Sequence, residues 1–136
     1  MTAPISDIGT GVTIVFGTSA FLAHLESVDG PHMQRESVKT SHMGTTTNHT
    51  FMPGDLVDNG EIQMTIHFDP SQTPPIAAVA ETVTITWPLP AGKTTPATWA
   101  ASCFATAFNP GARLEELMTA TLTLKVSGAV TIVAAA

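Results

Sequence analysis

The chain runs Glu61-Ile-Gln-Met-Thr-Ile-His-Phe-Asp69 near its middle, and this stretch decides the fold. Ile62, Met64, Ile66 and Phe68 alternate with polar residues, which places the four apolar side chains on one face of a β-strand. A slip of one residue in strand pairing would expose all four, so the register must be well fixed. The stretch therefore predicts a half-buried strand of an antiparallel sheet.

Threonine alternates with apolar residues in other parts of the chain, most clearly in Thr82–Trp87 and Thr119–Val126. The chain has 22 threonines, and only 12% of its residues are charged, about half the ~25% typical of soluble domains. Strands with a polar but uncharged face are poorly protected against edge-to-edge association, because natural monomers place Lys and Glu there. The composition indicates a subunit that assembles with others.

The pattern as a whole predicts a mainly β, antiparallel sandwich or barrel that forms a single domain over residues 1–136. We expect seven or eight strands and one short α-helix near 73–80, with Thr73 as its N-cap and Pro74 at its first position. Residues 44–60 have no hydrophobic period and are rich in turn residues, which predicts a long loop. The other strand candidates are Val12–Phe16, Phe21–Val28, Arg35–His42, Glu81–Trp87, Thr98–Phe108, Leu117–Ser127 and a strand-like tail from Val130.

Charge and composition argue against several classes of function. The formal net charge is −6, and the five Lys and Arg residues are scattered singly, so no basic patch for gripping phosphates is expected. No apolar stretch approaches the ~20 residues of a membrane helix, so we expect no membrane insertion. No signal peptide is visible, which predicts folding in a cytosol. The single cysteine, Cys103, excludes an internal disulfide and is expected to be a buried thiol.

Catalytic and metal-binding patterns are weak. His42, His49, Glu61 and His67 are the best candidate metal ligands, but their spacing matches no metal-binding template. No serine lies in a Gly-x-Ser-x-Gly motif, and no glycine-rich phosphate loop is present. We therefore expect no catalytic residues, no metal and no cofactor.

Five segments taken in order resemble a known family: Met33–Met43, Thr50–Gly54, Asp58–Pro70, Ala105–Pro110 and Met118–Gly128. Together they resemble the major tail tube proteins of long-tailed, non-contractile bacteriophages. The similarity runs over roughly residues 10–133. It implies a β-sandwich or barrel with one helix packed against it, six copies of which close into a ring. Stacked rings form a tube through which DNA leaves the capsid.

The resemblance also implies partners and contact segments. The homo-oligomer is expected to meet a tape measure protein, tail tip proteins and a tail terminator protein, in a virion tail assembled in the host cytoplasm. DNA is expected to pass through the tube without specific binding. The N-terminal arm 1–11, the loop 44–60 and the C-terminal arm 130–136 match segments that contact neighbouring subunits and rings. Within the loop, Phe51, Met52, Pro53 and Gly54 match the family motif.

A conduit for DNA should have a polar, negative wall that repels phosphates. The acid excess of this chain fits that requirement. Our hypothesis is that some of Asp58, Glu61, Asp69 and Glu81 face the lumen.

Three other classes remain open. The first is the tube of a related machine: a contractile tail, a phage-derived bacteriocin, a gene transfer agent or a secretion system. The second is a monomeric β-sandwich that binds a sugar or peptide, which would need an aromatic or acidic cleft. The third is a metal-dependent β-barrel enzyme built on the histidines. Genome neighbourhood separates the tubes from one another, and the zinc content of the pure protein tests the third class.

Overall fold

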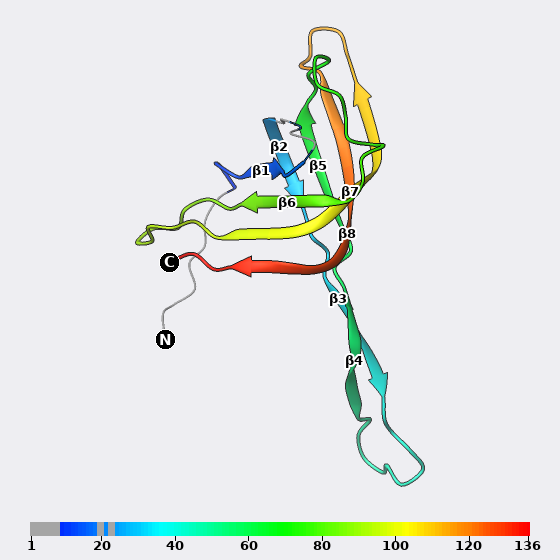
Figure 1. Cartoon of the computed structure of the whole chain (residues 1–136). Coiled ribbons are helices and arrows are strands. Elements are labelled where there is room, and N and C mark those ends of the chain that lie inside the picture. The colour runs from blue at the N-terminus through cyan, green and yellow to red at the C-terminus, as the bar shows by residue number, and fades with distance from the viewer. Residues whose placement is uncertain (1–8, 19–20, 22–23) are drawn as a thin grey trace.

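The computed structural model describes residues 9–18, 21 and 24–136, and every helix or strand in this part of the chain is a β-strand (Figure 1). Six strands form one antiparallel sheet in the order β1-β6-β7-β8-β5-β2, and β3 and β4 pair separately. The strands are β1 (Thr13–Phe16), β2 (His24–Asp29), β3 (Gln34–Lys39), β4 (Phe51–Asp58), β5 (Glu61–His67), β6 (Glu81–Thr86), β7 (Thr98–Gly111) and β8 (Thr119–Val133). The mainly β fold expected from the sequence is confirmed.

The two longest strands bend the large sheet. β7 and β8 pair along their whole lengths, but their register shifts after Ala101, which pairs with Val130, whereas Ser102 pairs with Ser127. The extra residues in β8 include Gly128, whose φ of 86° favours a residue without a Cβ. One half of the β7–β8 pair carries β6 and β1, and the other half carries β5 and β2 (Figure 1). The sheet therefore curls until its edge strands β1 and β2 are in contact.

One hydrophobic core fills the inside of the curled sheet. Every second residue is buried in β5, in β6 and in the part of β8 up to Val126, as strand alternation requires. Ile62, Met64 and Ile66 of the diagnostic stretch are fully buried, and Phe68 packs against the core. Each such side chain contributes about 1.5–3 kcal/mol on burial. The face of β5 that was expected to be buried is the face that enters the core.

The helix expected near 73–80 is wrong. The segment contains a single turn, in which the Ala78 N–H donates to the Pro75 carbonyl at 3.3 Å. Ile76 and Val79 are exposed, so the segment has no apolar face packed against the sheet. A two-turn helix is marginal without such packing, and a residue type that favours an N-cap at position 73 does not compensate for its absence.

The expected loop over 44–60 is also too long, because its second half is β4. β4 pairs with β3 from Lys39–Phe51 to Gln34–Asp58. Its residues are exposed almost throughout, so no alternation marks it in the sequence. Pro53 is tolerated because a two-stranded hairpin leaves open edges on which no ladder hydrogen bond is lost.

The end of the chain belongs to its own sheet. Val130–Val133 continue β8 and pair with Thr98–Ala101 of β7. The Ala136 carbonyl then accepts hydrogen bonds from the N–H groups of Thr94 and Thr95, at 2.8 and 2.9 Å. The segment expected as a C-terminal arm is thus held within the subunit. Most of the expected N-terminal arm, residues 1–8, lies outside the described residues.

Candidate assembly site

The most distinctive feature of the surface is a projecting hairpin, here called the arm, which consists of β3, β4 and the connecting residues 40–50. The arm extends away from the curled sheet (Figure 1). An isolated two-stranded hairpin is only marginally stable in water, and this one leaves apolar side chains exposed. They are Val38, Met43, Phe51, Met52, Leu56 and Val57. Exposed apolar surface of this kind marks a region that a partner covers.

The tip of the arm is organised by its own hydrogen bonds. The Thr40 N–H donates to the Thr50 carbonyl at 2.8 Å, and the two threonine hydroxyls are also 2.8 Å apart. The Ser41 hydroxyl accepts from the Thr50 N–H at 2.8 Å. The His42 carbonyl accepts from the Thr45 N–H at 2.9 Å. The tip therefore has a defined polar shape.

The root of the arm is tied to the bend of the large sheet. Asn59 is only 9% exposed, and its side-chain amide donates to the Gly128 carbonyl at 2.5 Å. The Gly60 carbonyl accepts from the Val126 N–H at 3.0 Å. The Asp58 carboxylate lies 3.5 Å from the Lys125 ammonium. These contacts fix the direction in which the arm leaves the sheet.

The structure places Phe51, Met52, Pro53 and Gly54 together on β4, in the half of the arm towards its tip. The first three are exposed, and Gly54 is half-buried. The Gly54 carbonyl accepts a hydrogen bond from the Arg35 guanidinium at 2.8 Å, which links β4 to β3 beside the register shift between Arg35 and Ser37. The sequence motif thus maps onto the arm as a paired strand, and its side chains are available to a partner.

The four acids predicted for a lumen wall do not form one group, although Asp58 and Glu61 both lie beside Lys125. Asp58 lies at the arm root, where the Gly60 N–H and then Lys125 lower its pKa. Asp69 caps a turn, and its pKa is lowered by the Ser71 hydroxyl and N–H. Glu61 is exposed on the outer face of β5, opposite Lys125.

Glu81 contradicts the lumen prediction. It begins β6 on the same face as Val83 and Ile85, which is the core face, and it is only 8% exposed. Its carboxylate accepts a hydrogen bond from the Thr18 N–H at 3.2 Å. The alternation of β6 therefore directs this acid inward, and the prediction that it faces a lumen is wrong.

The outer side of the large sheet carries a polar surface that sequence reasoning did not single out. We call it the threonine face. Thr65 of β5, Thr121 of β8 and Asn109 of β7 lie in one row across three strands. Gln63 and Thr123 form the next row. The signal was present in the alternation of threonine along β8, but only the register shows that the rows join.

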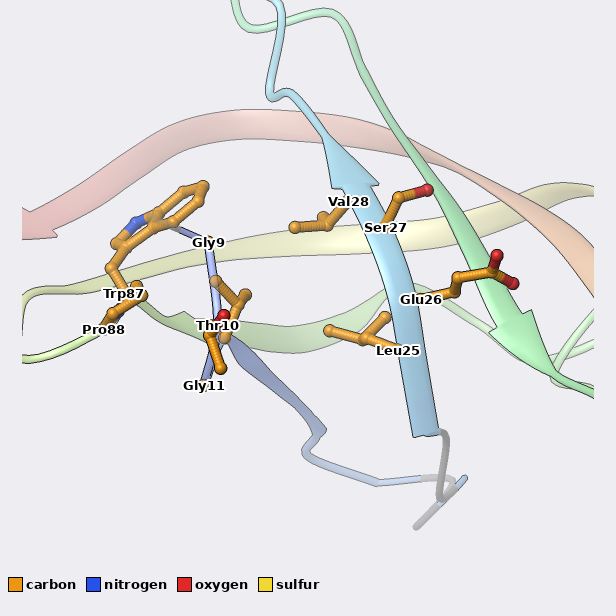
Figure 2. Close-up of a pocket in the computed structure, with 10 residues that line it drawn as sticks. Gly9, Thr10, Gly11, Leu25, Glu26, Ser27, Val28, Trp87 and Pro88 are labelled. Carbon is orange, nitrogen blue, oxygen red and sulfur yellow. The ribbon is translucent and has the colours of Figure 1, made fainter. Parts of the chain in front are cut away.

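A hollow of about 800 Å³ lies where the edge strands β1 and β2 approach each other (Figure 2). Leu25 and Val28 line it on one side, and Thr10, Gly11 and Trp87 on the other. The hollow presents apolar side chains and glycine backbone, and the Glu26 side chain points away from it (Figure 2). The lining offers no arrangement for acid–base chemistry.

The candidate metal ligands are spread over distant elements. His42 and His49 lie at the tip of the arm, whereas Glu61 and His67 lie at the two ends of β5. Among the described residues, no group of three or more His, Cys, Asp or Glu side chains could hold a metal ion. In that same part of the chain, no helix is long and apolar enough to cross a membrane.

No family model and no curated protein matches the chain. Solved structures do. A chain of the sheath/tube terminator of an extracellular contractile injection system is 17% identical, with a TM-score of 0.75 over 98% of this chain and 100% of that one. A chain of the tube-terminating cap of the anti-feeding prophage is 19% identical, with a TM-score of 0.70 over 98% of this chain and 93% of that one. A chain of a native gene transfer agent virion is 11% identical, with a TM-score of 0.72 over 95% of this chain and 100% of that one.

Because these sequence identities are low, the structural similarity establishes the fold of the chain and nothing more. The chain has the fold of subunits found in sheath/tube-terminator, tube-cap and gene transfer agent assemblies, and it matches those subunits over nearly their whole lengths.

Proposed function

We propose that this protein is a structural subunit that polymerises as stacked hexameric rings into a tail tube, the conduit for passage of DNA. The observation that carries the proposal is the rooted, apolar arm on a one-domain tube fold. A head-to-tail contact that closes produces rings, and repetition with a rise produces a filament. An arm that reaches from one subunit to the next supplies such a contact.

Open strand edges support the same function. Among the described strands, β1 and β2 each have one partner in the large sheet, and both strands of the arm have one partner. A charge-poor protein with four open edges is prone to uncontrolled association. Assembly into a closed ring covers strand edges of this kind, so that they form specific contacts between subunits and are no longer open to uncontrolled association.

The second part of the proposal concerns the type of particle to which the tube belongs. The segments from Met33 to Gly128 resemble non-contractile phage tail tubes, and on that ground we propose a virion tail assembled in the host cytoplasm, with tape measure, tail tip and terminator proteins as partners. The similar solved chains come from contractile injection systems and gene transfer agents, which supports a related tube or terminator as the alternative. A sheath gene beside this gene would favour the contractile class. We propose no enzymatic activity.

Negative-stain electron microscopy of the purified protein, at low and high concentration, tests the proposal. We expect hollow rings or tubes of uniform bore. The matched variant replaces residues 41–49 by Asn-Gly, which keeps β3 and β4 joined by a short hairpin turn and removes only the tip. This variant should remain folded by circular dichroism and lose tubes. Monomers at all concentrations, or normal tubes from the shortened arm, would contradict the proposal.

A further inference from the structure

We propose that the threonine face lines the conduit, so that cargo meets hydroxyl and amide groups along the wall instead of a layer of negative charge. The inference rests on the proposed tube function. It replaces the acid-lined wall expected from the sequence, because the structure places Glu81 in the core and pairs Asp58 with Lys125.

The threonine face is continuous across three strands. Thr121 pairs with Thr65 on one side and Asn109 on the other, and Thr123 pairs with Gln63 and Ala107. These four neighbours of the central strand carry no charge. Paired residues of an antiparallel sheet point to the same side, so their hydroxyl and amide groups form one patch on the side away from the core.

Charged side chains lie at the margins of this face. Glu61 lies directly opposite Lys125, and the Lys125 ammonium lies 3.5 Å from the Asp58 carboxylate. Phe104 completes that row on β7. Glu26 and Asp29 lie on the edge strand β2. A mobile chain that follows the middle of the face therefore passes neutral groups.

The distribution of exposed apolar residues distinguishes this face from the surfaces that contacts should cover. Large exposed apolar side chains occur on the arm and on the turn between β7 and β8, where Leu114 and Leu117 are exposed. Others lie on β1, in the connections that flank β6 and at the end of β8: Val15, Ile76, Val79, Leu89, Ile132 and Val133. The described residues place none within the threonine face, and Phe104 at its margin is the nearest. Subunit contacts should bury the apolar surfaces, whereas a wall of hydroxyl groups stays hydrated. The face is therefore suited to line a water-filled channel.

The position of the face is tested with Thr121→Cys, biotinylated with a maleimide before assembly. The native thiol Cys103 is buried, so wild-type protein treated in the same way is the background. We expect intact tubes to bind at least about tenfold less streptavidin than the same labelled protein after dissociation, because the streptavidin tetramer is too bulky to reach a lumen site. Equal binding by tubes and by dissociated protein places Thr121 on the exterior and overturns the inference.

The chemistry of the wall is tested with two variants that each raise the charge of the subunit by one. Thr121→Lys puts that charge in the middle of the face, and Glu61→Gln removes the acid at its margin while Asp58 still neutralises Lys125. The readout is co-sedimentation of a fluorescent single-stranded oligonucleotide with preassembled tubes at low salt. We expect Thr121→Lys to retain at least about tenfold more oligonucleotide than wild type, and the retention to fall steeply with salt.

In the same assay, Glu61→Gln tubes should retain within about twofold as much oligonucleotide as wild-type tubes, because the Glu61 carboxylate is not the group that cargo meets. Equal retention by the two variants, or wild-type behaviour of Thr121→Lys, overturns the inference. Failure of the proposed function gives a different result from failure of this inference, because the wild-type protein would then form no tubes in negative-stain electron microscopy. In that case the inference falls with the function on which it rests.

Discussion

Asn59→Ala tests whether the arm must be held in a fixed direction for assembly. The substitution removes the amide that donates to the Gly128 carbonyl at 2.5 Å. A hydrogen bond of this kind contributes about 1 kcal/mol net, and an orphaned buried partner adds about 1–3 kcal/mol. Gly128 is itself exposed, so water can replace the lost donor. We therefore expect a loss at the low end, about 1 kcal/mol, or a shift of about 3–5 °C in the melting temperature.

Asn59→Ala should weaken tube assembly more than its small loss of folding stability implies. Asn59 links the arm root to the bend of β8, and its loss lets the arm sample other directions. An arm that must be reoriented binds more weakly, because ordering it again costs free energy on association. We expect the concentration needed for tube formation, measured by sedimentation, to rise at least about tenfold, while urea denaturation shows the small loss in folding free energy.

Ile66→Val is the matched control. It removes one methylene group from the core of β5, which costs about 1 kcal/mol, and Ile66 lies away from the arm root in β5. We expect this variant to form tubes at the wild-type concentration. If Asn59→Ala and Ile66→Val assemble equally well, the arm root does not orient the arm, and the reasoning is refuted.

Three further predictions concern the fold. Leu122 is 0% exposed at the centre of the sheet, so Leu122→Ala should lower the free energy of unfolding by about 2–5 kcal/mol in urea denaturation; a loss below 1 kcal/mol would contradict the described core. Burial raises the pKa of the Cys103 thiol to about 11, so an alkylating reagent at pH 8 should modify Cys103 only after unfolding, and modification of native protein seen by mass spectrometry would show that it is accessible. The pKa of Asp69 is lowered, first by the Ser71 hydroxyl, so its stabilising effect is present above its unfolded pKa of about 4 and is lost as the pH falls through its lower folded pKa. Asp69→Asn should therefore reduce the loss of melting temperature between pH 5 and pH 2, and an unchanged profile would exclude this contribution.

The sequence by itself determined the strands that bury one face. In β5, β6 and β8, alternate residues enter the core, so a local period of two carries the information. The same alternation showed that threonine, not charge, occupies the other face. The dominance of β-structure follows from these local patterns, and the same patterns together with composition predict a single domain and a tendency to assemble.

Tertiary structure decided what alternation cannot encode. β4 is exposed on both faces, so burial imposes no period on it, and alternation in the sequence does not reveal it as a strand. The segment 73–80 has a residue that favours a helix N-cap, but Ile76 and Val79 stay exposed, and packing supplies most of the stability of a short helix. Glu81 is acidic and still lies on the core face, because the register of β6 is set by Val83 and Ile85. The rows of the threonine face join only through the pairing of β5, β7 and β8. Each of these features depends on contacts between residues far apart in the chain, whereas a local sequence pattern reflects only residues that are close together in the sequence.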